Sequence, residues 1–230
     1  MMRRQPKVEA PKYPDLRFET PLWSSGFTAV AGLDEAGRGA WAGPVSAAAV
    51  VLPPDAGLLE KLHGVRDSKQ MTSRQRAVWV DRIQAAALAW GVGFAEAHEV
   101  DEVGVVPATR LAMERALSAC GCEVQRLLVD AVYLPGLNIP QQILIKGDAR
   151  SLSIAAASVL AKTARDAVML ELEETYPGYC FARNKGYGTA AHRAGLDEIG
   201  PCKLHRFSFA PVKNAVIANT AQRSEAIRGY

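Results

Sequence analysis

The sequence contains no apolar stretch of the roughly 18 residues that a membrane-spanning helix requires. Its longest apolar run, residues 45–52, is interrupted by Ser46 and followed by Pro53-Pro54, which is typical of a buried strand. Residues 1–20 are charged and contain prolines but no apolar core, so we expect no secretory signal. Internal repeats and low-complexity tracts are also lacking. These absences predict a globular, cytoplasmic protein without membrane association.

Cysteine is scarce, with four residues in a chain of 230, at positions 120, 122, 180 and 202. They do not form the two CxxC pairs of a zinc site, and Cys120-Gly121-Cys122 alone is a weak metal signal. We expect reduced thiols, as is usual in the cytoplasm. The hydrophobic fraction of 49% and the charged fraction of 22% are those of an average globular protein. A chain of this length can bury a full core without disulfides.

The net charge is small, +3 from 27 basic and 24 acidic residues, and by itself indicates no class of partner. The distribution is more informative, because residues 180–213 contain six basic residues and only Asp197 and Glu198 as acids. A basic surface in this segment would suit a phosphate backbone. The alternative is an ordinary charged face in contact with solvent.

Hydrophobic patterns predict a mixed α/β sheet, because strands come first as a meander and later alternate with helices. The expected strands cover residues 27–33, 45–52, 90–95, 126–132 and 141–145. The expected helices cover residues 72–89, 107–119, 151–175 and 190–196. We expect three segments along the chain: a flexible N-terminal lead (1–21), a catalytic domain (22–213), and a C-terminal tail or peripheral helix (214–230).

Four acidic residues fall where expected strands end: Asp34, Glu35, Asp130 and Asp148. The ends of strands are the usual location of chemistry in α/β folds. Carboxylates gathered there would repel one another unless hard cations such as Mg²⁺ or Mn²⁺, which prefer oxygen ligands, were bound. Two such ions can activate a water and stabilise the leaving oxygen of a phosphodiester. The alternative for each acid alone is a surface position with no shared site.

Asp34 and Glu35 are adjacent, and neighbours in a regular strand point to opposite faces of the sheet. Both can reach one site only if the strand distorts or ends there, and Gly37 and Gly39 are compatible with such an end. Gly37-Arg38-Gly39, the GRG loop, lacks the Gly-Lys-Ser/Thr of a Walker A loop. Its glycines would let the backbone approach a ligand such as a ribose 2′-OH, although a tight turn is the alternative.

At this point the sequence resembles type 2 ribonuclease H, ribonuclease HII, over about residues 22–213. The resemblance depends on several blocks in a fixed order, and the full set is highly specific. The blocks are Gly32-Leu33-Asp34-Glu35-Ala36-Gly37-Arg38-Gly39, Ala42-Gly43-Pro44-Val45, Asp67-Ser68-Lys69, Leu128-Val129-Asp130, Lys146-Gly147-Asp148, Ser153-Ile154-Ala155-Ala156-Ala157-Ser158, Ala161-Lys162, Arg165-Asp166, Asn184-Lys185-Gly186-Tyr187-Gly188-Thr189 and His205-Arg206-Phe207-Ser208-Phe209-Ala210-Pro211.

The resemblance implies an RNase H-like fold: a five-stranded mixed sheet flanked by helices, with a helical C-terminal part. It implies that Mn²⁺ or Mg²⁺ is bound by the four catalytic acids, Asp34, Glu35, Asp130 and Asp148. It also implies that the backbone of Gly37, Arg38 and Gly39 reads the 2′-OH on the 5′ side of a junction. Tyr187 would then stack on the sugar of the following deoxynucleotide, and Lys69 either contacts a substrate phosphate or is simply solvated.

The implied enzyme is a metal-dependent endonuclease of the ribonuclease H type. Members of the family hydrolyse the RNA strand of RNA/DNA hybrids. They also incise 5′ to ribonucleotides embedded in duplex DNA, a step of ribonucleotide excision repair, and leave 5′-phosphate and 3′-OH ends. The expected partners are therefore such hybrids and duplexes, and we expect a monomer.

The sequence departs from the family pattern at Ala131, where the family usually has glycine, and in Pro201-Cys202-Lys203-Leu204. Four residues have two interpretations. Trp41 either packs or contacts substrate, Asp166 either pairs with Lys162 or orients a ligand, and His205 with Arg206 either contacts phosphate or closes a structural network.

Three rival functions remain to be compared. A binding-only module would use the basic segment, but it would not need all four acids. The type 3 relatives carry an additional N-terminal domain, for which residues 1–21 are too few. An enzyme that reads RNA alone would show no preference for junctions.

Overall fold

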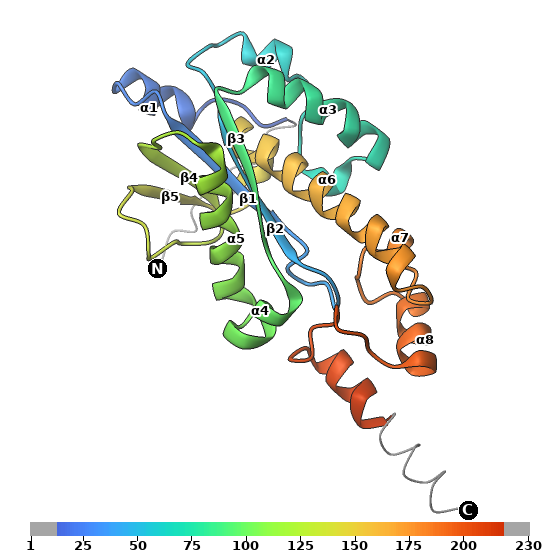
Figure 1. The fold of residues 1–230 in the computed structure, drawn as a ribbon. Helices are drawn as coiled ribbons and strands as arrows, with labels where there is room; N and C mark the ends of the chain where they lie inside the picture. The colour runs from blue at the N-terminus through green and yellow to red at the C-terminus, as the bar shows by residue number, and fades with distance from the viewer. Residues whose placement is uncertain (1–12, 219–230) are drawn as a thin grey trace, which may run out of the picture.

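The computed structural model describes residues 13–218, whose centre is a five-stranded mixed sheet of order β3-β2-β1-β4-β5 (Figure 1). The strands are β1 (Val30–Ala36), β2 (Val45–Val51), β3 (Ala89–Ala95), β4 (Arg126–Asp130) and β5 (Gln141–Leu144). β1 pairs antiparallel with β2, which pairs antiparallel with β3. On its other side β1 pairs parallel with β4, and β4 with β5. The predicted mixed sheet is confirmed.

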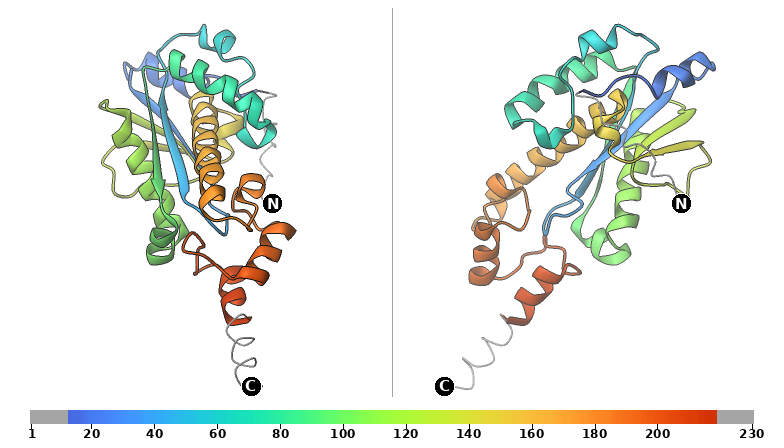
Figure 2. Two further views of the ribbon diagram at one scale, coloured as in Figure 1. Left: turned by 45° about the vertical axis from the view of Figure 1, so that its right-hand side comes forward. Right: turned by 180° about the vertical axis from the view of Figure 1, so that it is seen from behind.

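Helices cover both faces of the sheet (Figures 1 and 2). α4 (Ala97–Val103) and α5 (Val105–Cys120) lie on one face, and α3 (Ser73–Ala86) and α6 (Leu152–Thr175) lie on the other. β2 is buried along its whole length because it lies between the two layers. In the described part of the chain no helix combines the length and the apolar character needed to cross a bilayer.

Small residues let the helices lie close to the sheet. A Cβ atom at Gly93 would collide with the α5 backbone at Ala112 and Ala116. On the opposite face, the fully buried run Ala155-Ala156-Ala157 of α6 packs against β1 and β2. Close packing leaves no space for larger side chains, so a longer side chain at these positions would force backbone shifts. The small-residue pattern therefore sets the distance between the two layers.

The long helices α3 and α6 begin at side-chain caps. The Thr72 side chain accepts from the Gln75 amide, and Gln75 returns a bond to the Thr72 amide, which forms a capping box before α3. The Ser151 hydroxyl likewise caps α6 at the Ile154 amide. The predicted and observed bounds of these helices differ by up to three residues, because terminal residues are held by tertiary contacts as well as by local signals.

Short helices were not predicted: α1 (Glu19–Ser24), α2 (Leu58–Lys61), α4, and α7 (Phe181–Asn184). Helices of four to seven residues are too short to show a helical period, and contacts from distant segments stabilise them. α1 is an example. The carboxylate of Glu19 is fully buried and accepts hydrogen bonds from the hydroxyls of Ser151 and Ser153 and from the Ser153 amide.

The ends of the chain are described only in part. Of the expected flexible lead, residues 1–12 lie outside the described residues, whereas Leu16 and Glu19 are buried against the body of the protein. Of the expected tail, residues 219–230 lie outside the described residues. A helix beginning at Ala210 covers the described remainder and extends away from the sheet (Figure 2).

Ala131, the departure from the family pattern, adopts a left-handed conformation with φ of 52°. This conformation costs an L-residue about 1–2 kcal/mol, and glycine would remove that cost. Glycine also loses more conformational entropy on folding, which offsets roughly 0.5–1 kcal/mol of the gain. We therefore expect Ala131→Gly to raise the free energy of unfolding by about 0.5–1 kcal/mol in urea titrations. Ala167→Gly, on the exposed face of α6, is the control and should lower it by about 1 kcal/mol. Equal losses in both variants would contradict the role of backbone strain at Ala131.

Candidate active site

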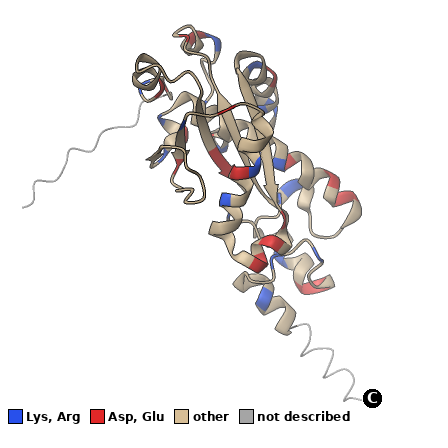
Figure 3. Cartoon of the chain, turned by 60° about the vertical axis from the view of Figure 1, so that its left-hand side comes forward, with Lys and Arg blue, Asp and Glu red and all other residues tan. Residues whose placement is uncertain are grey.

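The candidate site lies where β4 ends while its neighbour β1 continues. The parallel pairing of β1 with β4 reaches its last pair at Leu33 and Val129, whereas the antiparallel pairing with β2 continues through Ala36. Asp34 and Glu35 therefore extend past the end of β4 into an open rim of the sheet. Acidic and basic segments adjoin there near the middle of the molecule (Figure 3).

Three of the four predicted acids come together at this rim. One carboxylate oxygen from each of Asp34, Asp130 and Asp148 lies within 4.8 Å of the others. Asp130 is the last residue of β4, and Asp148 lies in η2 (Gly147–Ala149), the turn that follows β5. Because β1, β4 and β5 are parallel, their carboxyl ends meet at one edge, as the strand-end argument predicts.

Glu35 lies outside this three-residue cluster and on the other face of β1. Its cross-strand partner is Ala47, which packs on the α5 side, whereas Asp34 pairs with Ala48 on the α6 side. One oxygen of the Glu35 carboxylate lies 3.6 Å from a guanidinium nitrogen of Arg38. The pair thus remains in a regular ladder, and the strand ends one residue later, at Ala36. The two carboxylates reach the rim from opposite sides of the strand.

The donor set fits hard divalent cations. Asp34 is only 3% exposed, and its Oδ2 atom, like Oε2 of Glu35, is buried without a hydrogen-bond partner in the described part of the chain. The other oxygen of Asp34 accepts from the Glu35 amide at 2.8 Å, and Asp130 accepts from the Gly147 amide at 2.8 Å. Buried anionic oxygens without donors are costly unless a cation compensates them. Oxygen-only ligands of this kind are those that Mg²⁺ and Mn²⁺ select.

Mutual repulsion and burial perturb all four acids. Burial, with repulsion from Glu35, raises the pKa of Asp34 well above its usual value. Burial likewise raises the pKa of Glu35 and that of Asp130. For Asp148, burial and the neighbouring charge of Asp67 raise the pKa to about 6. Groups with such shifts in a cleft are typical of functional sites.

Lys69 faces the same acids from η1 (Ser68–Gln70). Burial lowers the pKa of its ammonium, but attraction from Asp34, Asp67 and Asp148 outweighs this and raises it overall. Asp67 caps the turn by accepting from the Lys69 amide at 2.9 Å. Lys69 also lines a cleft of about 530 Å³ with Asp130 and Asp148, so it is placed where a substrate phosphate could approach the acids.

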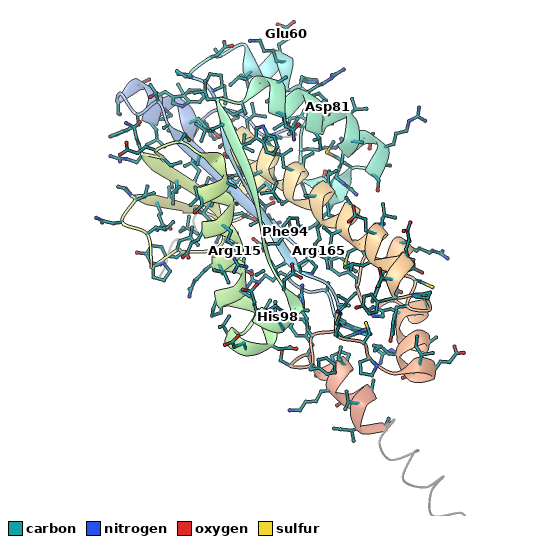
Figure 4. The ribbon with its side chains drawn as sticks, in the orientation of Figure 1. Glu60, Asp81, Phe94, His98, Arg115 and Arg165 are labelled. Atoms are coloured by element: carbon teal, nitrogen blue, oxygen red, sulfur yellow. The ribbon has the colours of Figure 1, made fainter. Side chains whose placement is uncertain are left out.

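The GRG loop is held by a buried arginine that comes from α6 on the side facing the sheet (Figure 4). Gly37 has φ of 85°, and a Cβ atom there would collide with the guanidinium of Arg165. Arg165 donates to the carbonyls of Pro44 at 2.8 Å and Ala42 at 3.0 Å, and to that of Lys185 at 2.7 Å. Glycine at position 37 is therefore required both by the backbone conformation and by this contact.

A second buried arginine, Arg206, holds the same loop from the C-terminal segment. It donates to the Arg38 carbonyl at 2.9 Å and to the Gly43 carbonyl at 3.1 and 2.8 Å. Its own amide donates to the Trp41 carbonyl at 2.8 Å. The loop thus takes its shape from residues more than 160 positions away in the sequence.

Tyr187, the predicted sugar-stacking residue, is half-buried beside the GRG loop. The centroid of its ring lies 5.5 Å from the Arg165 guanidinium carbon and 5.5 Å from the Lys162 ammonium nitrogen. Trp41 packs against Gly188 and lies 5.0 Å from the Arg193 guanidinium. Gly37 and Tyr187, which are distant in sequence, therefore both lie beside the Arg165 side chain.

Sequence reasoning did not single out Arg165, and it left Arg206 with two interpretations, of which the observed backbone contacts support the structural network. Arg165 and Arg206 are fully buried and have no carboxylate within ion-pair distance among residues 13–218. Arginines are usually exposed or paired, and no sequence pattern separates a buried arginine from a solvated one. The signal that was available is the sequence context: both lie in blocks of the resemblance, next to Asp166 and His205. Asp166 pairs with Arg76 at 2.7 Å and with Lys162 at 2.6 Å, as the interpretation of an ion pair predicts.

Comparisons with known proteins agree with this geometry. The sequence matches the family described as Ribonuclease HII over residues 31–212. A Ribonuclease HII of Chloroflexus aurantiacus is 51% identical over 206 residues, covering 89% of this chain and 97% of that protein. A Ribonuclease HII of Roseiflexus castenholzii is 48% identical over 217 residues, covering 94% of this chain and 96% of that protein.

A solved structure shares the fold. The crystal structure of the ribonuclease H2 from Pyrococcus horikoshii OT3 superposes with a TM-score of 0.67 at 24% identity, covering 81% of this chain and 96% of that one. The predicted RNase H-like fold is therefore confirmed. Together with the family match over most of the length, the chain belongs to the ribonuclease HII family of metal-dependent endoribonucleases, hydrolases that act on RNA/DNA hybrids.

Proposed function

We propose that this enzyme also incises 5′ to single ribonucleotides embedded in duplex DNA and leaves 5′-phosphate and 3′-OH ends. The observation that carries the proposal is the placement of the GRG loop. The loop follows Glu35 after a single residue, Ala36, and is held by a hydrogen bond from Arg206 to the Arg38 carbonyl and by contact of Gly37 with Arg165. A group bound by this backbone would lie next to the place where the phosphodiester is cut. Such an enzyme would act as a monomer in ribonucleotide excision repair.

We propose that Asp34, Glu35, Asp130 and Asp148 hold two Mg²⁺ or Mn²⁺ ions. Bound ions of this kind would supply an activated water and stabilise the leaving oxygen. The chain's own groups do the rest. Asp34, Asp130 and Asp148 present oxygens from three strand ends, and Glu35 presents its carboxylate from the opposite face of β1. The ammonium of Lys69 offsets their charge and would hold the substrate phosphate at the rim.

Selection of a ribose would come from the backbone of Gly37, Arg38 and Gly39. Amides and carbonyls held in place can donate to or accept from a 2′-OH, which DNA lacks. Tyr187, whose ring centroid lies 5.5 Å from the Arg165 guanidinium carbon, would stack on the sugar of the deoxynucleotide that follows the ribonucleotide. The basic residues of the segment 180–213 would lie along the phosphate backbone of the duplex. Residues 22–213 would then form the whole catalytic unit.

Asp34→Asn tests the metal site. Removal of one buried anionic ligand should reduce cleavage of a duplex with one embedded ribonucleotide by roughly 10³-fold in Mg²⁺, equivalent to about 4 kcal/mol. Binding of the same duplex, measured by fluorescence anisotropy, should change little. Asp81→Asn, exposed on α3 (Figure 4), is the control and should cleave at the wild-type rate. Wild-type cleavage by Asp34→Asn would rule out the assigned site.

Junction reading is tested by comparing a duplex that contains one ribonucleotide with a plain RNA/DNA hybrid. Tyr187→Ala should lose about tenfold on the duplex with one ribonucleotide and less on the plain hybrid, because the ring would lose its stacking contact with the deoxynucleotide that follows the ribonucleotide; aromatic stacking on a base is worth about 1–3 kcal/mol. Tyr187→Phe keeps the ring and should retain the wild-type ratio of cleavage rates on the two substrates. Equal losses on both substrates would favour an enzyme that reads RNA alone.

Asp148→Asn tests the electrostatic cost of the acids without metal. Its folded-state pKa, about 6, lies above the ordinary value of 3.8, so the folded protein binds more protons than the unfolded chain between these values. Stability from this group is present below pH 4 and lost as the pH rises toward 6. With a chelator present, the melting temperature of Asp148→Asn should therefore exceed that of the wild type by a margin that grows as the pH rises from 4 to 6. Added Mn²⁺ should strongly stabilise the wild type and the control Asp81→Asn, and it should stabilise Asp148→Asn only weakly.

A further inference from the structure

Two histidines form a buried pair behind Tyr187. His192 lies on α8 (Ala190–Ile199), His205 precedes the C-terminal helix, and they are 0% and 1% exposed. Their Nε2 atoms are 3.0 Å apart. Nδ1 of His192 lies 3.0 Å from the carbonyl oxygen of Tyr187, and Nδ1 of His205 lies 3.0 Å from the amide nitrogen of Cys202. The two rings thus connect the Cys202 backbone to the Tyr187 backbone.

The two ends of this connection determine where the ring protons lie. The Cys202 amide can only donate, so Nδ1 of His205 accepts and its proton is on Nε2. Nε2 of His192 then accepts from His205, which leaves the proton of His192 on Nδ1. That proton points to the Tyr187 carbonyl, which can only accept. Each neutral ring is therefore assigned a single tautomer.

The reverse assignment fails at both ends. A proton on Nδ1 of His205 could reach the Cys202 carbonyl at 3.2 Å, but it would also oppose the Cys202 amide hydrogen. Nδ1 of His192 would then direct a lone pair at the Tyr187 carbonyl. The thiol of Cys202, 3.3 Å from Nδ1 of His205, is compatible with the first assignment because it can donate to a lone pair.

The surroundings keep both rings neutral. The rings of Trp41, Tyr179 and Phe181 pack around the pair. Burial lowers the pKa of His192, and burial with repulsion from His192 lowers the pKa of His205 to about 4. The other titratable groups that face the pair are Cys202 and Tyr179, and burial raises the pKa of both. A proton added to either ring would set two N–H groups against each other.

The Tyr187 carbonyl that ends this relay also accepts from the Thr189 amide at 2.8 Å, and the Tyr187 amide donates to the Asn184 carbonyl at 3.0 Å. The residues just before Tyr187 are held from a distance, because the Gly186 carbonyl accepts from the Trp41 amide at 2.8 Å and the Lys185 carbonyl accepts from Arg165 at 2.7 Å. The histidine relay adds a link from Tyr187 itself to the 202–205 segment, which also leads into Arg206 and so to the GRG loop. The two substrate-reading elements share one support.

We propose that His205 and His192 are positioning residues: a one-directional hydrogen-bond relay from the Cys202 amide to the Tyr187 carbonyl fixes the Tyr187 ring for junction reading. This role rests on the proposed function of Tyr187. The relay would act on recognition of the substrate that contains a single ribonucleotide and little on hydrolysis of a plain hybrid.

The tautomers can be measured directly in the intact protein by long-range ¹H–¹⁵N correlation spectra of the histidine rings. The chain has four histidines, so the spectrum is simple to assign with single variants. The proposal requires His192 as the Nδ1–H tautomer and His205 as the Nε2–H tautomer at pH 7. His98, exposed on α4 (Figure 4), is the internal reference for a solvated ring. The opposite tautomers, or a protonated ring at pH 7, would overturn the relay whatever Tyr187 does.

Two substitutions at His192 separate positioning from packing. The amide of asparagine can place its NH₂ near the Nδ1 position and keep the bond to Tyr187. The amide of glutamine reaches the Nε2 position and keeps only the bond to His205. His192→Gln should raise KM for the single-ribonucleotide duplex about tenfold with kcat changed less, the effect of one lost hydrogen bond. His192→Asn keeps the bond to the Tyr187 carbonyl and loses the link to His205, so its KM should rise less than that of His192→Gln, by about threefold.

Tyr187→Ala in the wild-type background distinguishes the ways in which this test can fail. If Tyr187→Ala lowers junction selectivity while both His192 variants lose equally, His192 only fills space and the positioning role is wrong. If Tyr187→Ala has no effect on selectivity, the proposed function of Tyr187 fails and the positioning role with it, even where the spectra show the relay. If His192→Gln does not fold, the tautomers of His192 and His205 measured in the wild type decide whether the relay exists.

Discussion

Two buried guanidinium groups without carboxylate partners hold the region around the acids together. Arg206 donates to the Arg38 carbonyl inside the GRG loop, and Arg165 donates to the Ala42 carbonyl after it. Arg165 also reaches the turn that carries Tyr187 through the Lys185 carbonyl. A buried cation is stable only where such acceptors are placed around it, so each arginine imposes one arrangement on the loops.

The acids impose the opposite constraint. Burial and repulsion from neighbouring acids raise the pKa of Asp34 and that of Asp148, and Oδ2 of Asp34 and Oε2 of Glu35 are buried without a hydrogen-bond partner among residues 13–218. The sheet tolerates this arrangement because the rest of β1 is buried between two layers of small residues. Stability is therefore supplied by the core, and strain is confined to the rim where the chemistry takes place.

Much of this arrangement could be predicted from local patterns. Alternation and apolar runs located all five strands, and Thr72 and Ser151 marked the starts of two long helices. The acids at strand ends indicated a metal site before any family was considered. The short helices α1, α2 and α7 were missed, because four to six residues carry no period and their stability comes from partners such as Ser151 and Ser153. Ala131 could be flagged as a departure, but its positive φ could not.

The sequence by itself determined which residue types were available: four acids after strands, a loop of glycines, and small residues along α6. It also determined the sheet class, because strand and helix periods are local properties. Only the tertiary structure decided that both Asp34 and Glu35 lie at the rim without a break in β1, since that depends on where β4 stops. Likewise, only folding brings Arg206 to Arg38 and His192 to Tyr187 and His205. Hydrogen bonds between distant segments depend on position in space, and no local pattern encodes it.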